Sequence, residues 1–168
     1  MSQHDIELTV NGEAISARVK SRTNLVDFLR QDLGLTGTHV GCEQGFCGAC
    51  TIEVDGQMVR ACLMLAVQVD GSTINTIEGF SQSGRTATLQ RAFVEHNALQ
   101  CGFCTSGMIA TALDYIETDG RPDRQAIRMY LSGNYCRCTG YQAIVDAIAD
   151  VTAQPLSSTR EQDQNHEQ

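Results

Sequence analysis

The sequence predicts an α+β protein built from two small domains, the first rich in strands and the second helical. Three observations carry this prediction. Alternating apolar residues with two-residue turn signals dominate residues 1–79, apolar residues at helical spacing dominate residues 85–153, and the eight cysteines divide equally between the two halves. Each half, of about 80 residues, is marginal alone, so we expect bound metal to contribute to folding.

Short strands and tight turns predict the first domain. Asn11-Gly12 and Asp55-Gly56 are hairpin signals flanked by apolar residues, and a short helix is expected over residues 25–29. The order of strand pair, helix, cysteine loop and strand pair is that of a β-grasp domain, expected over residues 1–79. The expected strands are residues 5–10, 14–19, 51–54, 58–62, 65–69 and 73–77.

Helical spacing predicts a four-helix bundle over residues 85–153. A stretch rich in Gly and Ser at residues 80–84 is expected to be a linker between the two domains. Residues 154–168 form a polar tail, which we expect to be disordered unless a partner orders it. The expected helices are residues 88–96, 105–117, 123–131 and 139–151.

The first cysteine set has the spacing C-x4-C-x2-C, which is the plant-type [2Fe–2S] ferredoxin pattern. Glycines inside this loop let the backbone curl, so that amide N–H groups can point at the sulfurs. Zinc sites favour paired C-x2-C knuckles, so this spacing favours iron–sulfur over zinc. The predicted ligands are Cys42, Cys47, Cys50 and Cys62.

The second cysteine set is a C-x2-C pair followed, after 31 residues, by a C-x-C pair. A C-x-C pair cannot lie on one face of a regular helix, so it must occupy a turn before the last helix. Spacing alone leaves both a zinc site and an iron–sulfur cluster open here. The predicted ligands are Cys101, Cys104, Cys136 and Cys138.

Composition narrows the class of protein further. The net charge of −8 argues against a nucleic-acid partner. Met1–Val10 has no basic stretch followed by an apolar run, and no apolar run approaches the roughly 18 residues of a membrane span. Cysteine-rich metal motifs suit a reducing compartment, so we expect a cytoplasmic protein without membrane insertion. No catalytic nucleophile, acid–base pair or phosphate loop is evident.

Other residues in the two loops have less specific interpretations. Phe46 and Phe103 could shield bound clusters from water, although ordinary packing explains them equally well. His39 lies three residues before Cys42 and is expected to be structural, because a Rieske-type site needs two histidines in paired motifs.

Three strings in the sequence match a known family in order and spacing: GCEQGFCGACT, QCGFCTSGM and GNYCRCTGY. The sequence resembles the small iron–sulfur subunits of molybdenum hydroxylases, the multi-subunit relatives of xanthine dehydrogenase that include carbon monoxide, aldehyde, nicotinate and quinoline oxidoreductases. The resemblance covers residues 5–152. Thr105-Ser106 departs from the Thr-Pro that relatives often carry, which leaves every cysteine ligand in place.

The resemblance implies a plant-type ferredoxin domain with one [2Fe–2S] cluster and a four-helix bundle with a second. The bundle cluster would lie nearer the molybdopterin, in a dinucleotide form, of a large subunit. The other cluster would lie nearer the FAD of a medium subunit. By analogy, Gln100 would hydrogen-bond the molybdopterin, and Cys138 would lie close to it. The resemblance further implies a dimer of heterotrimers.

The expected function is therefore electron transfer, from a molybdopterin centre through two [2Fe–2S] clusters to FAD or another acceptor. Two alternatives stay open at this point: a zinc-stabilised interaction module, and a free-standing ferredoxin. The resemblance also leaves the substrate open, because in this family the large subunit selects among carbon monoxide, purines, aldehydes and N-heteroaromatic compounds.

Overall fold

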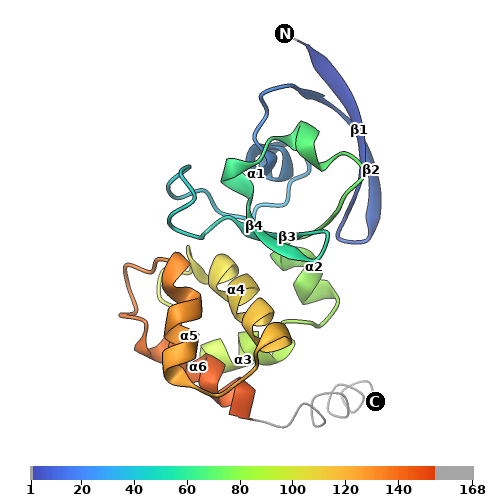
Figure 1. Cartoon of the computed structure of the whole chain (residues 1–168). Coiled ribbons are helices and arrows are strands. Elements are labelled where there is room, and N and C mark those ends of the chain that lie inside the picture. The colour runs from blue at the N-terminus through green and yellow to red at the C-terminus, as the bar shows by residue number, and fades with distance from the viewer. Residues whose placement is uncertain (1, 154–168) are drawn as a thin grey trace.

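The computed structural model describes residues 2–153, and its strands form one five-stranded mixed sheet in the order β2-β1-β5-β3-β4 (Figure 1). Strand β1 pairs antiparallel with β2 and parallel with β5, and β5 pairs antiparallel with β3. The polar tail expected over residues 154–168 lies outside the described residues. The strands are β1 (Gln3–Val10), β2 (Glu13–Lys20), β3 (Thr51–Val54), β4 (Gln57–Arg60) and β5 (Thr73–Asn75).

Both predicted hairpins are confirmed. Asn11 and Gly12 have φ angles of 51° and 84°, and Asp55 and Gly56 have φ angles of 49° and 78°. Positive φ at both central residues is the type I′ geometry, whose twist matches that of the flanking strands. The alternating apolar residues of β1 face the core with exposures of 5% or less: Ile6, Leu8 and Val10.

The strand predicted over residues 65–69 is wrong, because this segment forms a 3-10 turn, η3 (Ala66–Val69). Ala66 and Val69 are both fully buried, and one 3-10 turn places residues three apart on the same side. The side chain of Gln68 also accepts the amide N–H of Leu65, which satisfies the start of the turn. Burial of two residues three apart therefore overrides the strand-like composition.

The predicted short helix begins as α1 (Leu25–Asp27) and continues as a π-helical turn, η1 (Phe28–Asp32). A second 3-10 turn, η2 (Ala61–Leu63), follows β4 and carries Cys62, which was expected to end a strand. The η2 turn thereby supplies one thiol of the first candidate site.

The helical half consists of α3 (Ala87–Glu95), α4 (Thr105–Thr118), α5 (Arg124–Tyr130), a 3-10 turn η4 (Leu131–Gly133) and α6 (Gln142–Ala153). Among residues 2–153, no helix has the length and apolar character that crossing a bilayer requires. The apolar faces of these helices share one core, whose fully buried side chains include Phe93, Met108, Ile127, Ile144 and Ile148.

The segment expected to be a linker is ordered. Helix α2 (Ile77–Gln82) runs through most of it, and Phe80 is 1% exposed within the core of the helical half. The guanidinium of Arg85 stacks over the Phe80 ring and pairs with two carboxylates, Glu53 on β3 at 3.1 Å and Glu117 on α4 at 2.9 Å. A cation that bridges the sheet and the longest helix ties the two halves together.

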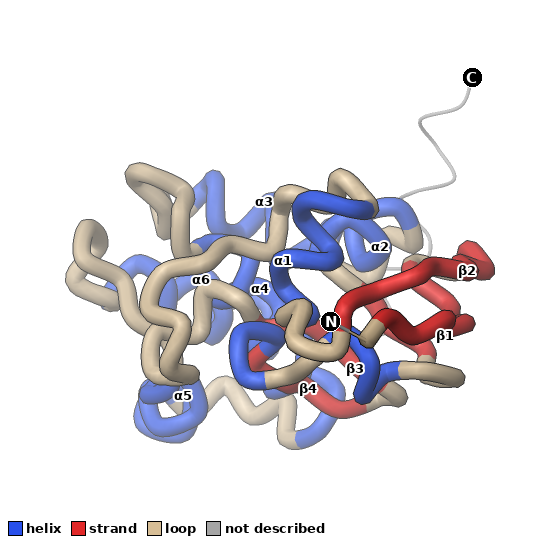
Figure 2. Tube along the Cα trace, turned by 90° about the horizontal axis from the view of Figure 1, so that it is seen from above, coloured by secondary structure: helices blue, strands red, loops and turns tan. Residues whose placement is uncertain are grey.

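The sheet and the helices lie side by side, with α4 next to β3 and β4 (Figures 1 and 2). Met58 of β4 and Ile77 of α2 pack against the helical core, so the apolar contact continues across the boundary. The loop that carries the first cysteine set precedes β3, and the loops that carry the second set flank α4 and α6.

Candidate cluster sites

The first cysteine loop wraps its own backbone around a sulfur. The amide N–H groups of Gln44 and Cys47 each donate to Cys42 Sγ at 3.4 Å. Gly45 and Gly48 have φ angles of 79° and 72°, which only glycine adopts without strain. The curled loop with inward amides is the arrangement that the spacing predicted.

The fourth thiol of the first set comes from the 3-10 turn η2. Cys50 and Cys62 are 2% and 5% exposed, and the amide N–H of Ala61 donates to the Cys50 carbonyl at 3.2 Å. Burial, together with a hydrogen bond to the Cys62 thiol, raises the pKa of Cys50 to about 12. These two thiols therefore face each other on the inner side of the loop.

Cys42, in the outer pair of the first set, has a pKa shifted in the opposite direction. The amide N–H groups of Cys47 and Gln44 lower the pKa of Cys42 to about 7, because they stabilise the thiolate. A thiolate is the form that binds iron, so the loop favours the ligating state of Cys42 before any metal arrives.

The second cysteine set combines the start of α4 with a loop before α6. Cys104 is the N-cap residue of α4, whereas Cys136 and Cys138 precede the first residue of α6, Gln142. The last helix thus begins three residues later than the sequence predicted. The Cys138 thiol donates to Cys101 Sγ at 3.6 Å, and burial together with a hydrogen bond to Cys136 raises the pKa of Cys104 to about 12.

Two residues that the sequence analysis did not single out hold Cys136. The Thr139 hydroxyl and amide donate to Cys136 Sγ at 3.1 and 3.4 Å, and although burial opposes the effect, they lower the pKa of this thiol. The Tyr141 hydroxyl accepts the amide N–H of Cys136 at 2.9 Å. Tyr141 has a φ of 68°, a strained angle for a tyrosine that its buried contacts must offset.

The thiols meet in four pairs: Cys42 with Cys47, Cys50 with Cys62, Cys101 with Cys138, and Cys104 with Cys136. Within residues 2–153, no three His, Cys, Asp or Glu side chains converge tightly enough for a single metal ion. A [2Fe–2S] cluster needs two thiolates on each of two irons, whereas one zinc needs about four ligands around one point. Four thiol pairs match the two thiolates that each iron of a [2Fe–2S] cluster requires.

The two residues predicted to contact a pterin lie together at the surface. The Gln100 side-chain amide donates to the Cys138 carbonyl at 3.1 Å, and Gln100 is exposed. Cys101, next to Gln100, is exposed, whereas the other seven thiols are half-buried or buried. The second site thus presents one edge outward from this chain.

His39 connects the two cysteine loops, a role that its sequence position did not signal. Its ring stacks on Phe103 with centroids 4.8 Å apart, and Nδ1 lies 2.8 Å from the Phe103 carbonyl oxygen. Phe103 is 47% exposed and Phe46 is 64% exposed, so within this chain neither ring is enclosed. Ser106 also lies 3.4 Å from His39 Nδ1, while Cys104 takes the N-cap position.

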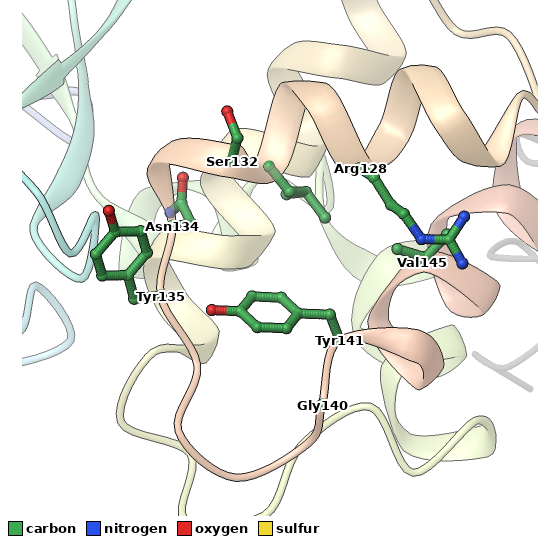
Figure 3. A pocket seen from close by; sticks show the side chains of 8 residues that line it. Arg128, Ser132, Asn134, Tyr135, Gly140, Tyr141 and Val145 are labelled. Carbon is green, nitrogen blue, oxygen red and sulfur yellow. The ribbon is translucent and has the colours of Figure 1, made fainter.

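A cavity of about 350 Å³ lies directly behind the loop of the second site (Figure 3). The Tyr141 ring lies across it, with its hydroxyl directed at the loop that leads from Asn134 to Gly140. The remaining wall comes from α5, η4 and α6: Arg128, Leu131, Ser132 and Val145.

Comparison with known proteins gives two family matches and close relatives. The family model described as "2Fe-2S iron-sulfur cluster binding domain" matches residues 8–74, and the model described as "[2Fe-2S] binding domain" matches residues 76–149. Caffeine dehydrogenase subunit gamma of Pseudomonas sp. (strain CBB1) is 56% identical, over 90% of this chain and 93% of its own length. The nicotine 6-hydroxylase small subunit of Paenarthrobacter nicotinovorans is 49% identical, over 89% and 90%.

Solved structures agree with these matches. Quinoline 2-oxidoreductase from Pseudomonas putida 86 superposes with a TM-score of 0.84 at 50% identity, covering 89% of this chain and 93% of the matched chain. Aldehyde oxidoreductase from Desulfovibrio gigas superposes with a TM-score of 0.82 at 45% identity, but the match is only 17% of that longer chain.

Proposed function

The chain belongs to the family of small iron–sulfur subunits of molybdenum hydroxylases, and from this premise we propose how it carries electrons. It is an electron-transfer subunit of an oxidoreductase complex and holds two [2Fe–2S] clusters. Each cluster accepts one electron at a time, so two clusters in series convert a two-electron oxidation elsewhere in the complex into single-electron steps. The zinc-stabilised module and the free-standing ferredoxin are not favoured.

We assign the first cluster to Cys42, Cys47, Cys50 and Cys62, and the second to Cys101, Cys104, Cys136 and Cys138. The single observation that supports the assignment best is the meeting of these thiols in four pairs, two in each half. Each iron of a cluster would take one pair. In the first site the pair of Cys50 and Cys62 is buried, whereas in the second site the pair of Cys104 and Cys136 is half-buried and Cys101 is exposed.

Electrons enter, in this proposal, at the second site. Gln100 and Cys138 lie at its exposed edge, linked by the hydrogen bond between the Gln100 amide and the Cys138 carbonyl. There they would contact a molybdopterin, in a dinucleotide form, held by a large subunit. At the first site, by contrast, the chain itself excludes water from two of the thiols, since Cys50 and Cys62 are almost fully buried.

Electrons leave from the first site toward the FAD of a medium subunit. Phe46 and Leu63 are 64% and 62% exposed beside this loop, which suits a surface that a partner covers.

We propose a four-helix bundle formed by α3, α4, α5 and α6 around the second cluster, and an assembly of small, medium and large subunits doubled by a two-fold axis. Thiolate ligation suits the cytoplasm, where we place the complex.

Metal analysis of the purified complex tests the assignment. About four irons and four acid-labile sulfides per copy of this chain, with EPR signals of two distinct reduced clusters, are expected. About two zincs per chain and no EPR signal would contradict it. Recovery of the chain free of larger molybdenum- and flavin-containing subunits after stringent washing would favour a free-standing ferredoxin instead.

The relatives' names indicate a substrate class. Caffeine, nicotine and quinoline, after which three of these enzymes are named, are all nitrogen heterocycles. We propose that the complex oxidises an N-heteroaromatic compound in the large subunit. Reduction of the clusters of this chain by quinoline or caffeine, but not by an aliphatic aldehyde, is the expected result in stopped-flow measurements, and the reverse preference would contradict it.

A further inference from the structure

Asn134 lies in the motif GNYCRCTGY, two residues before Cys136, and the proposed function gives it no role. It is 2% exposed, which is unusual for an asparagine, and it comes directly after the η4 turn. A buried polar side chain must find hydrogen-bond partners inside the protein, so its contacts indicate what it holds together.

The Asn134 side chain uses its full hydrogen-bonding capacity. Its Nδ2 donates to the Gly48 carbonyl at 3.2 Å and to the Gly107 carbonyl at 3.1 Å. Its Oδ1 accepts from Thr111 Oγ1 at 3.0 Å and from Arg60 Nη2 at 3.2 Å. Two donated and two accepted bonds satisfy the amide completely.

These partners belong to different parts of the chain. Gly48 lies in the first cysteine loop, between Cys47 and Cys50, whereas Gly107 and Thr111 lie on α4, which begins at the second site. Asn134 itself belongs to the loop that carries the C-x-C pair. One side chain thus connects both cysteine loops and the helix between them.

Close backbone approach makes this junction rigid. A Cβ atom at Gly107 would lie 2.1 Å from the Gly48 carbonyl oxygen, and a Cβ atom at Gly48 would lie 2.6 Å from Asn134 Nδ2. Beside the side chain, the Tyr135 amide donates to the Cys47 carbonyl at 2.8 Å, and Arg60 Nη2 donates to the Gly133 carbonyl at 2.9 Å. The loops cannot slide past one another without breaking several of these contacts.

We propose that Asn134 is the positioning residue that fixes the distance and orientation between the two cluster-bearing loops, and thereby the rate of electron transfer between them. The inference rests on the proposed function, because it requires two clusters. Electron transfer through protein falls steeply with distance, so a small separation of the loops slows it. The magnetic interaction between two reduced clusters depends on the same distance and orientation.

The test compares the assembled complex carrying Asn134→Asp with the wild-type complex. The substitution keeps the shape of the side chain but places a carboxylate oxygen against the carbonyls of Gly48 and Gly107, where acceptor meets acceptor. We expect both clusters to remain, each with its own EPR signal when reduced singly. We expect a smaller spin–spin splitting when both are reduced, and a several-fold slower transfer from the second cluster to the first.

Asn11→Asp is the matched control. Asn11, in the turn between β1 and β2, also donates a partly buried amide hydrogen bond, to Thr76 Oγ1 at 3.0 Å, and this partner lies outside both cysteine loops. It should leave the splitting and the transfer rate unchanged even where it lowers the unfolding temperature. This separates positioning from a general loss of stability.

Thr111→Val decides the question if Asn134→Asp fails to assemble with both clusters. It removes one hydrogen bond to Asn134 Oδ1 at nearly constant volume, so a smaller reduction in splitting and rate is expected. An unchanged splitting and rate in the variant that assembles would overturn the inference. A complex without two iron–sulfur signals in the wild type would overturn the proposed function itself, which keeps the two failures apart.

Discussion

The two cysteine sites hold their sulfurs by different means. In the first, three thiols come from one nine-residue stretch, and backbone amides donate to Cys42. In the second, the thiols come from pairs 32 residues apart in the chain, and a side-chain hydroxyl, that of Thr139, joins the Thr139 amide in donating to Cys136. The first site is therefore set by the conformation of one loop, and the second by how segments pack together.

The exposure of the thiols to solvent also differs between the two sites. Cys50 and Cys62 are nearly inaccessible in the first site, whereas Cys101 is exposed in the second. A site that folds locally can bury half of its ligands within its own domain. An exposed edge at the second site suits the proposal that electrons enter there from a partner subunit.

Substitution of one ligand in each site should give the largest effects. Cys47→Ser and Cys104→Ser should each lose about two irons per chain and one of the two EPR signals. Cys104→Ser should also destabilise the helical half, because the lost cluster contributes to folding and Cys104 packs against the core of that half. Iron analysis, EPR and thermal unfolding of the purified complexes measure these effects.

In the Cys47→Ser complex, substrate should still reduce molybdenum and the second cluster, while turnover with an external acceptor stops. Retention of about four irons and both EPR signals in the two variants would mean that the ligand assignment is wrong.

The two clusters should be lost at different rates when iron is removed, because their ligands differ in exposure to solvent. With the chain expressed alone and treated with a chelator in air, we expect the second cluster to be lost before the first, because Cys101 is open to solvent. In the complex, where we propose that a partner covers that edge, the difference should shrink or disappear. EPR spectra taken over time give the two rates, and faster loss of the first cluster in the free chain would contradict the comparison.

Removal of a single hydrogen-bond donor from the second site should have a moderate effect on the reduction potential of its cluster. Thr139→Val removes the hydroxyl that donates to Cys136 Sγ, which stabilises the more negative, reduced cluster. The reduction potential of the second cluster should fall by tens of millivolts, given that about 59 mV is a tenfold change in a one-electron equilibrium. Redox titration followed by EPR measures it.

Thr139→Ser is the control, because it keeps the hydroxyl donor and should keep the potential near the wild-type value. The first cluster, which no contact links to Thr139, should not shift in either variant. A potential that moves equally in Thr139→Ser would assign the effect to packing instead of the hydrogen bond.

The smallest effect concerns the first loop without its cluster. Because the pKa of Cys42 is lowered to about 7 from its ordinary value of 9.0, its thiolate stabilises the folded loop above pH 9. That contribution is lost as the pH falls through about 7. Alkylation of Cys42 in the cluster-free chain should therefore reach half its maximal rate near pH 7, as measured by mass spectrometry of the labelled peptide.

Cys50, with a pKa of about 12 and almost no exposure, provides the internal control and should stay unlabelled over the same range. A midpoint for Cys42 near pH 9 would show that the loop amides do not hold its thiolate.

The sequence predicted those structural features that depend on residues close together in the chain. Both hairpins followed from their Asn-Gly and Asp-Gly turns, and the curled first loop followed from the cysteine and glycine spacing. Four helices appeared near their expected positions, because a 3.6-residue apolar period needs only local sequence. The assignment of ligands to clusters stays a proposal.

What the sequence did not predict depends on contacts between distant segments. Residues 65–69 have strand-like composition, but burial of Ala66 and Val69 on one side produced a 3-10 turn. His39 and Asn134 join loops that are 64 or more residues apart in sequence, in contacts such as His39 with Phe103 and Asn134 with Gly48. Such pairs leave no periodic signal in one sequence.

The close contact between Gly48 and Gly107 limits how this module can be recombined. Because two backbones touch there with no room for a side chain, each half fits only a counterpart with the same bare surface. A chimera that takes one half from a relative should assemble when both glycines are kept, and fail when either becomes alanine. We therefore expect the two halves to be exchangeable between relatives only as one block.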